Sequence, residues 1–329
     1  MNFPLVSVIM PVYNASFYIR EAIESILSQE FIDFEFIIIN DGSTDNSEEI
    51  ILSYSDVRIK YVKNENNLKI ISTLNKGFEM AKGKYIARMD ADDISDPLRF
   101  TKQIKLLENN PEIGILGTYV QQIGESDKLV CYPENDEDIR YSLIFFNPFV
   151  HSSVFIRKSI IDEFCLQFSQ NMLHVEDYDM WMRILQYTKG MNLPEVLLKY
   201  RVHKNQISSI HSEYQRQNND LLRGNYLLSL GLDVGLSKNI TVLFSQEEFL
   251  EINSLILLMN TVSKNGFFSV SNFNSRLKKD ILKLTKDRIL SKSYISLNEY
   301  KLLILHSNYF TLKQFLSLTI RFIFSNKLF

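Results

Sequence analysis

Residues 5–41 read LVSVIMPVYNASFYIREAIESILSQEFIDFEFIIIND, and the fold class follows from their pattern. Both ends of this segment are short apolar runs rich in β-branched residues, which is typical of buried strands. Between them Ile19, Ile23 and Ile26 recur at helical spacing, and Ser16 is the predicted N-cap. A strand, a helix and a second strand in this order predict two parallel strands joined by a crossover helix.

Two further apolar runs extend the same pattern. RIKYVKN (58–64) and KYIARMD (84–90) have strand composition, and the intervening segment 69–83 places Leu74 and Phe78 on one helical face. The chain therefore predicts an α/β fold. In such folds, ligands bind at the carboxyl ends of the parallel strands.

The second half of the chain is mixed. GILGTYVQQIG (114–124) and HSSVFIRKSII (151–161) have strand composition, whereas HVEDYDMWMRIL (174–185) has helical periodicity. Beyond residue 218 the pattern is helical and glycine is scarce. We therefore expect one domain over residues 1–220 and a separate helical region over residues 221–329.

Three polar loops follow predicted strands and should meet at one edge of the sheet. They are PVYN (11–14), NDGSTD (40–45) and DADD (90–93). The loop after the first strand has no GxGxxG pattern, and GFEMAKGK does not match a Walker phosphate loop, which argues against both kinds of nucleotide site. Asp41 is either a turn and capping residue or an acceptor for a base or ribose.

DADD places Asp90, Asp92 and Asp93 within four positions at the end of a predicted buried strand. Such carboxylates repel one another unless a positive charge lies among them. A solvated charged loop is the alternative, but hard oxygen ligands at this density favour Mg²⁺ or Mn²⁺.

A second acidic pair, Glu176 and Asp177, begins the helix predicted over residues 174–185. Acids at this position are favoured by the helix dipole alone. The pair could equally supply a general base with a raised pKa. His203 follows a predicted strand. A lone histidine more often has a structural role, and contact of His203 with a metal or a phosphate is the alternative.

Bulk composition constrains the partners. The formal net charge of −3 gives no indication of a nucleic-acid-binding protein, and two cysteines without a CxxC motif suit a reducing cytoplasm. No apolar run approaches the roughly 18 residues of a membrane span. Residues 271–329 hold 11 Lys/Arg and 3 acids, a charge of +8. Their final stretch, 309–329, predicts a helix that either packs on the body or lies on an anionic membrane surface.

Together these motifs resemble those of family 2 glycosyltransferases with the GT-A fold, from Val6 to about Leu230. The resemblance rests on the following motifs: VSVIMPVYN, ILSQEFIDFEFIIINDGSTD, NNLKIISTLNKGFEMAKGKYIARMDADD, HSSVFIRKS, VEDYDMW and LLKYRVHKNQIS. It implies a Rossmann-like mixed sheet flanked by helices, with a helical C-terminal region. It also implies inverting, single-displacement sugar transfer from a UDP-sugar with the help of Mn²⁺ or Mg²⁺.

The resemblance further implies roles for single residues. Those that would bind the donor nucleotide are Pro11, Val12, Tyr13, Asn14, Asp41, Asn67, Asp90, Ala91 and Asp92. Asp90 and Asp92 match the DxD metal motif, His203 would complete the metal shell, and Asp177 matches the catalytic base. Glu176, His151 and Asp93 would line the sugar or acceptor pocket. Many relatives have a glycine where this chain has Lys69, so contacts assigned to that loop differ here.

ARMDADD and LPEVLLKYRVHKNQISS, followed by the basic tail, are similar to bacterial lipooligosaccharide β-1,3-N-acetylglucosaminyltransferases. This similarity implies UDP-N-acetylglucosamine as donor and a glycan or lipid-linked glycan as acceptor, in the cytoplasm or on the inner face of its membrane. UDP-galactose and UDP-glucose are alternative donors. A nucleotide-sugar-binding protein without catalysis would lack the acidic residues that this chain keeps. A nucleotidyltransferase would need a glycine-rich basic loop in place of MPVYNAS.

Overall fold

The computed structural model describes residues 3–203, 206 and 212–229. The strands are β1 (Val6–Val12), β2 (Phe34–Asn40), β3 (Ile59–Lys63), β4 (Tyr85–Arg88), β5 (Ile94–Ser95), β6 (Ile113–Gly124), β7 (Leu129–Val130), β8 (Phe155–Arg157) and β9 (Lys189–Val202). The helices are α1 (Ile19–Leu27), α2 (Ser47–Leu52), α3 (Lys69–Met80), α4 (Arg99–Asn109), α5 (Asp136–Ser142), the 3₁₀ turn η1 (His151–Ser153), α6 (Lys158–Glu163), α7 (Glu176–Ile184) and α9 (Ser212–Ser229).

All described strands belong to one sheet, in the order β3-β2-β1-β4-β8-β6-β9-β5, with β7 paired to β6. β1 pairs in parallel with β2 and with β4, and β2 pairs in parallel with β3. Every residue of β1, β2 and β4 is buried, as expected for strands with helices packed on both faces. The predicted parallel α/β half of the fold is confirmed.

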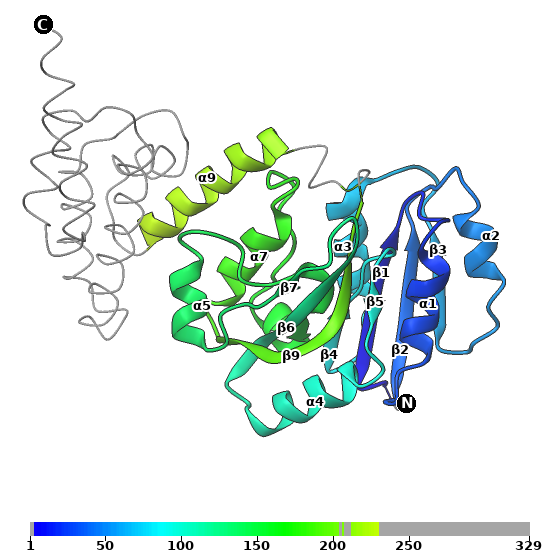
Figure 1. Ribbon diagram of the computed structural model, residues 1–329, viewed down its shortest axis with the longest axis horizontal. Helices are drawn as coiled ribbons and strands as arrows, with labels where there is room; N and C mark the ends of the chain where they lie inside the picture. The colour runs from blue at the N-terminus through cyan, green and yellow to red at the C-terminus, as the bar shows by residue number, and fades with distance from the viewer. Residues whose placement is uncertain (1–2, 204–205, 207–211, 230–329) are drawn as a thin grey trace, which may run out of the picture. The chain divides into compact units, whose positions relative to one another are not determined.

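The other half of the sheet is mixed. β8 is antiparallel to both β4 and β6, β9 is parallel to β6, and β5 is antiparallel to β9. In Figure 1, β3 and α2 lie at one end of this sheet, and α5 and α7 lie toward the other. The molecule thus joins a parallel half-sheet to a mixed extension.

The strand predicted over residues 151–161 is correct only for β8. Residues 151–153 form η1, because Ser153 N donates to Val150 O at 2.9 Å. After β8 the chain turns into α6, where Lys158 and Asp162 form an ion pair of 2.6 Å one helical turn apart. The apolar residues of this segment are buried on both sides of the short strand without belonging to it.

The predicted N-cap of α1 is wrong. The N-cap is Tyr18, without a side-chain capping bond, and Ser16 instead donates its backbone N–H to Asp45 Oδ2 at 2.9 Å. Ala15 N likewise donates to Ser47 Oγ at 2.9 Å. The loop after β1 is therefore bonded to the loop after β2, and this takes precedence over local capping.

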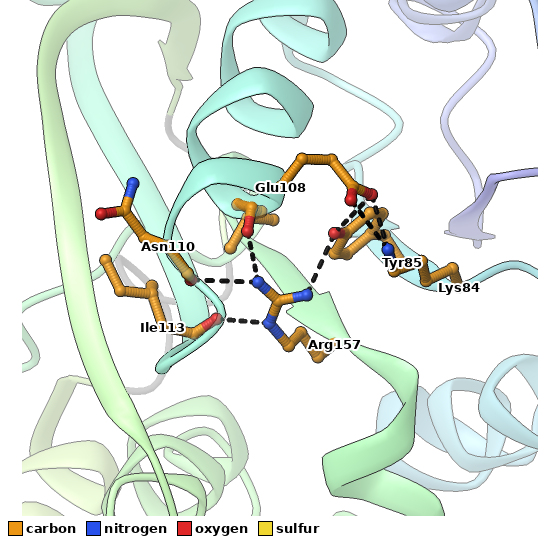
Figure 2. A network of polar contacts seen from close by, with 7 residues as sticks. Lys84, Tyr85, Glu108, Asn110, Ile113 and Arg157 are labelled. Carbon is orange, nitrogen blue, oxygen red and sulfur yellow. Dashed lines mark hydrogen bonds and ion pairs between the residues drawn. The ribbon is translucent and has the colours of Figure 1, made fainter.

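At the edge of the sheet away from these loops, Arg157 joins the end of β8 to its neighbours (Figure 2). Its Nε donates to Ile113 O at 2.7 Å, and Nη2 donates to Asn110 O at 3.0 Å. Its Nη1 donates to the Tyr85 hydroxyl at 3.0 Å, which in turn donates to Glu108 at 2.9 Å. These bonds fix α4 and the start of β6 against β4.

α9 packs beside α7. Gln215 Nε2 donates to His174 O at 3.0 Å, Asn218 Nδ2 donates to Leu173 O at 3.1 Å, and Leu222 is buried. The domain boundary predicted at residue 220 falls inside this helix and stays a prediction. The basic segment and the predicted terminal helix lie outside the described residues. Within the described part of the chain, no helix has the length and apolar content that crossing a bilayer requires.

Candidate active site

The three predicted loops do meet at the carboxyl edge of the sheet. Asn14 links the first two: its N–H donates to Ser43 Oγ at 3.0 Å, and its Oδ1 accepts from Thr44 N at 2.8 Å. Pro11 and Val12 are buried at the end of β1, whereas Tyr13 is 51% exposed above them. The aromatic ring of Tyr13 is therefore open to a ligand at this edge.

Asp41 acts as a link between loops and not as a helix cap. It is 4% exposed, and its Oδ1 accepts hydrogen bonds from Asn64 Nδ2 and Leu68 N, both at 2.8 Å. This brings the loop before α3 against the carboxyl end of β2. Asn67 belongs to that loop, and its Oδ1 accepts from Lys69 N at 2.9 Å.

Lys69 occupies the left-handed region, with φ 70°. A residue with a Cβ rarely adopts this backbone conformation, whereas glycine adopts it freely. This is the position at which the family resemblance implies a glycine. The loop keeps a backbone suited to glycine although the residue is a lysine.

Asp90 and Asp92 lie just after β4, and the carboxylate of each contacts one charged or titratable side chain among the described residues. Asp90 Oδ1 accepts from Arg88 Nη2 at 2.6 Å, and Asp92 Oδ2 lies 3.0 Å from His203 Nε2. Burial raises the pKa of Asp92, and the neighbouring charge of Asp90 raises it further. Ala91 between them is 9% exposed. The two carboxylates are thus close enough to repel each other.

Asp93 faces the interior. It is fully buried, and its carboxylate accepts from the Ser152 hydroxyl and from Arg201 N, the latter at 2.8 Å. Burial raises its pKa well above the usual range, with a further contribution from Asp90 and Asp92. In this conformation Asp93 braces the loop from inside and does not line an open pocket.

The acidic loop suits a divalent cation, although the described residues hold no preformed cluster of three His, Cys, Asp or Glu side chains for a metal. Burial is the main cause of the raised pKa of Asp92, and a cation between the two carboxylates would relieve the repulsion from Asp90 that adds to it. Mg²⁺ commonly uses one or two carboxylates and completes its shell with water and phosphate oxygens. Asp90 and Asp92, with His203 beside them, fit that requirement.

Asp177 lies in the first turn of α7. Its Oδ2 accepts from Asn147 Nδ2 at 2.8 Å, and its Oδ1 accepts from Tyr178 N at 2.7 Å. Burial raises the pKa of Asp177 to about 6, and the charge of Asp90 acts in the same direction. A carboxylate with this pKa is ionised at neutral pH and can still accept a proton.

Glu176 precedes Asp177 and is 8% exposed. Burial raises the pKa of Glu176 to about 8, and the charge of Asp177 raises it further. Its Oε2 is buried and has no hydrogen-bond partner in the part of the chain that the structure describes. Glu176 is therefore a protonated acid at neutral pH, adjacent to an ionised one.

His151 packs between aromatic rings behind α7. Its ring centre lies 5.7 Å from that of Trp181 and 5.8 Å from that of Phe168. Its Nε2 and the Trp181 Nε1 are buried, and neither has a hydrogen-bond partner within residues 3–203, 206 and 212–229. Burial lowers the pKa of His151 well below its usual range, so the ring is neutral.

The sequence reasoning missed several residues of this site. Arg88 had a signal, because it is a charged residue in a buried strand two positions before Asp90. Arg201 also contacts the acidic loop: its Nε donates to Asp92 O at 2.8 Å. Asn147 had no signal, because 30 residues separate it from Asp177 and no local pattern marks it.

Comparison with known families gives a match over residues 7–161 to the family described as "Glycosyl transferase family 2". An uncharacterised glycosyltransferase of Haemophilus influenzae is 34% identical over 98% of this chain and 97% of its own length. Another, from Methanocaldococcus jannaschii, is 38% identical over 61% of this chain and 72% of its own length.

Two kinds of solved structure share the fold. Residues 1–349 of TarS from S. aureus, in complex with UDP-GlcNAc, superpose with a TM-score of 0.61 at 17% identity, covering 87% of this chain and 85% of that one. The mannosyltransferase PcManGT from Pyrobaculum calidifontis, in complex with GDP-Man and Mn²⁺, gives 0.52 at 14% identity, covering 98% and 85%. The fold is therefore of the GT-A type. From its sequence relatives, the chain belongs to family 2 of the glycosyltransferases.

Proposed function

We propose that this protein is an inverting, metal-dependent glycosyltransferase. It moves N-acetylglucosamine from UDP-N-acetylglucosamine to a hydroxyl of a glycan acceptor, in the synthesis of bacterial surface polysaccharide or lipooligosaccharide. The observation that carries the proposal is the placement of Asp177. This carboxylate has a pKa of about 6, and it lies near enough to Asp90 for the Asp90 charge to raise that pKa. A carboxylate suited to act as a base and a carboxylate suited to bind a metal thus lie within electrostatic reach of each other, which supports the proposal.

A nucleotide-sugar donor fits the first two loops. Tyr13 offers an exposed ring beside buried Asp41, whose carboxylate is fixed in place by two hydrogen bonds. The structures with the same fold carry UDP-GlcNAc in TarS and GDP-Man in PcManGT, so a nucleotide diphosphate sugar is the common ligand class. The sequence motifs favour the uridine form.

Asp90, Asp92 and His203 would hold a divalent cation, Mn²⁺ or Mg²⁺. A bound cation would neutralise the charge that develops on the departing diphosphate. The carboxylates supply two negative charges, of which the Arg88 guanidinium already balances one through Asp90. His203 lies against Asp92 and against the ring of Tyr18, with ring centres 5.1 Å apart, so its ring is held at the site.

Asp177 would act on the acceptor. Its carboxylate takes the proton of the acceptor hydroxyl as that oxygen forms a bond to C1 of the donor sugar. The bond between C1 and the diphosphate oxygen breaks, and its electron pair leaves with UDP. One displacement inverts the configuration at C1. Asn147 keeps Asp177 oriented for this step by donating to Oδ2.

The class of acceptor is proposed from the sequence motifs alone. A lipid-linked glycan would bring the protein to the inner face of the cytoplasmic membrane, and the basic segment of residues 271–329 would supply the contact. Deletion of residues 309–329 should then weaken binding to anionic vesicles and reduce its dependence on salt. Unchanged, salt-insensitive binding would contradict the membrane contact.

A donor screen tests the function. Purified protein is incubated with UDP-GlcNAc, UDP-galactose, UDP-glucose and GDP-mannose, each with Mn²⁺ and each with EDTA, and release of nucleoside diphosphate is measured. We expect release with Mn²⁺ from UDP-GlcNAc above the other donors, and none with EDTA. Equal release in EDTA would contradict metal dependence, and preference for another donor would correct the sugar.

A further inference from the structure

Arg88 is the buried positive charge of the acidic loop. Its side chain is 3% exposed, which is rare for arginine unless it is paired. Its Nη2 donates to Asp90 Oδ1 at 2.6 Å, and its Nη1 donates to the carbonyl of Met89. Two separate nitrogens of the planar guanidinium are thus engaged, so both its position and its orientation are defined.

The bond from Arg88 makes the two carboxylate oxygens of Asp90 different in their environment. Oδ1 is held by the guanidinium, whereas Oδ2 has no hydrogen-bond partner among the described residues, and the Asp90 side chain is 32% exposed. One oxygen therefore faces the protein, and the carboxylate keeps a second oxygen for a ligand. An aspartate without such a partner would rotate about its terminal torsion.

A second buried arginine holds the backbone of Arg88. Arg99 is fully buried, and its Nη2 donates to Arg88 O at 2.9 Å. Its Nε donates to Gln103 Oε1 at 3.0 Å, and the Gln103 amide donates to Leu116 O and to Ser153 O, both at 3.0 Å. The end of β4 is therefore fixed from α4, β6 and η1 together.

Arg88 also lies near the acids of α7. Its charge opposes the burial that raises the pKa of Glu176 and adds to the burial that lowers the pKa of His151. Among the described residues, its Nε and Oε2 of Glu176 are buried without a hydrogen-bond partner. The guanidinium is thus bonded to the acidic loop and lies within electrostatic reach of the first turn of α7.

We propose that Arg88 is a positioning residue for the metal-binding loop: it anchors Asp90 through Oδ1 and leaves Oδ2 directed to the divalent cation. This inference rests on the proposed metal-dependent function. It differs from a purely electrostatic role, because Arg88 carries a positive charge that would by itself repel a cation. The fork geometry of the guanidinium, and not its charge, is what favours metal binding.

The test is the affinity of the full-length protein for Mn²⁺ in the presence of UDP, measured without turnover by calorimetry or by the Mn²⁺ electron paramagnetic resonance signal. Arg88→Lys keeps the charge but cannot bond Asp90 and the Met89 carbonyl in the same plane. We expect it to bind Mn²⁺ at least about 10-fold more weakly, the usual effect of losing a residue that orients a ligand. Arg88→Met should lose at least as much. Arg58→Lys is the matched control, because Arg58 is a partly buried arginine, directly before β3, that pairs with Asp56. This variant should bind Mn²⁺ as the wild type does.

The outcomes separate the alternatives. Wild-type affinity in Arg88→Lys, or tighter binding in Arg88→Met, would overturn the positioning role and leave the metal site intact. Absence of Mn²⁺ binding in the wild type would overturn the proposed function itself. A double-mutant cycle with Asp90→Asn adds a second criterion, because Arg88→Lys should have little further effect once Asp90 is neutral.

A measurement on the wild type keeps the proposal testable if the variants do not fold. In a crystal structure with Mn²⁺ and UDP, Arg88 Nη2 should remain on Asp90 Oδ1 while Oδ2 binds the metal. Displacement of Arg88 with Mn²⁺ bound to Oδ1 would overturn the inference.

Discussion

Asn147 donates a hydrogen bond of 2.8 Å from Nδ2 to Oδ2 of Asp177. Burial and the charge of Asp90 raise the pKa of Asp177, whereas the bond from Tyr178 N and this bond from Asn147 lower it, and the balance leaves the pKa at about 6. The carboxylate of Asp177 is thus ionised at neutral pH. If Asp177 is the proposed base, activity at neutral pH should depend in part on a neighbour that lies 30 residues away in the sequence.

The pH dependence of transfer follows from this balance. Because the base must be ionised, kcat should fall as pH decreases through about 6, with a slope of one proton. Asn147→Leu removes the bond that stabilises the ionised form, so the same limb should move to higher pH. The pH profile of transfer measures both, with Asn110→Ala, a residue bonded to Leu106 O, as control. An unshifted limb in Asn147→Leu would contradict the assignment.

Glu176 should make the protein less stable at alkaline pH. Its pKa in the folded state is about 8, above the ordinary 4.5, so its contribution to stability is fully present below pH 4.5 and is lost as pH rises through 8. Glu176→Gln stays neutral, and its stability relative to wild type should therefore increase between pH 5 and pH 9 by more than about 1 kcal/mol.

Urea unfolding in EDTA at the two pH values measures this difference. Glu79→Gln, an exposed acid on α3, is the control and should show no such change. The same relative stability of Glu176→Gln at both pH values would show that Glu176 has an ordinary pKa.

Asp92 should be required for the metal. Asp92→Asn removes one of the two carboxylates proposed to hold the cation, and activity should fall by at least about 100-fold, with a higher Mn²⁺ concentration needed for half-maximal rate. A titration of transfer rate with Mn²⁺ separates loss of metal binding from loss of folding. A variant with wild-type Mn²⁺ dependence would remove Asp92 from the metal site.

Lys69 should carry backbone strain. With φ at 70°, replacing it by glycine should raise the free energy of unfolding by about 0.5–1 kcal/mol, since glycine adopts this region without steric cost. Lys69→Ala keeps the Cβ and should give no gain. Thermal or urea unfolding compares the three proteins. Equal stability of the glycine and alanine variants would argue against strain at this position.

The parallel half of the fold could be predicted because β1 and β2 are continuous buried runs separated by one amphipathic helix. The meeting of Asn14, Asp41 and Asp90 followed from the rule that strand ends share an edge. The bounds of the short strand β8 could not be predicted, because Val154 before it and Ile161 after it are also apolar and buried.

The site was predicted as a set of motifs but not as a network. Local sequence motifs mark Asp90 and Asp177 as candidate site residues. Their hydrogen-bond partners Arg88 and Asn147 can be identified only from the folded structure. The crowding of three acids indicated a missing positive charge, and the structure supplies part of it through Arg88. Asp93 belongs to the same motif, yet its side chain is directed inward, which the sequence pattern does not reveal.

The most direct test of the account is the Asp177→Asn variant. Asparagine keeps the size of the side chain but cannot accept the acceptor's proton, so transfer from UDP-GlcNAc should fall by at least about 100-fold, consistent with loss of a general base. Binding of UDP with Mn²⁺, measured by calorimetry on the same preparation, should be unchanged. Full transfer activity in Asp177→Asn would contradict the central claim that this carboxylate is the base of a glycosyltransferase.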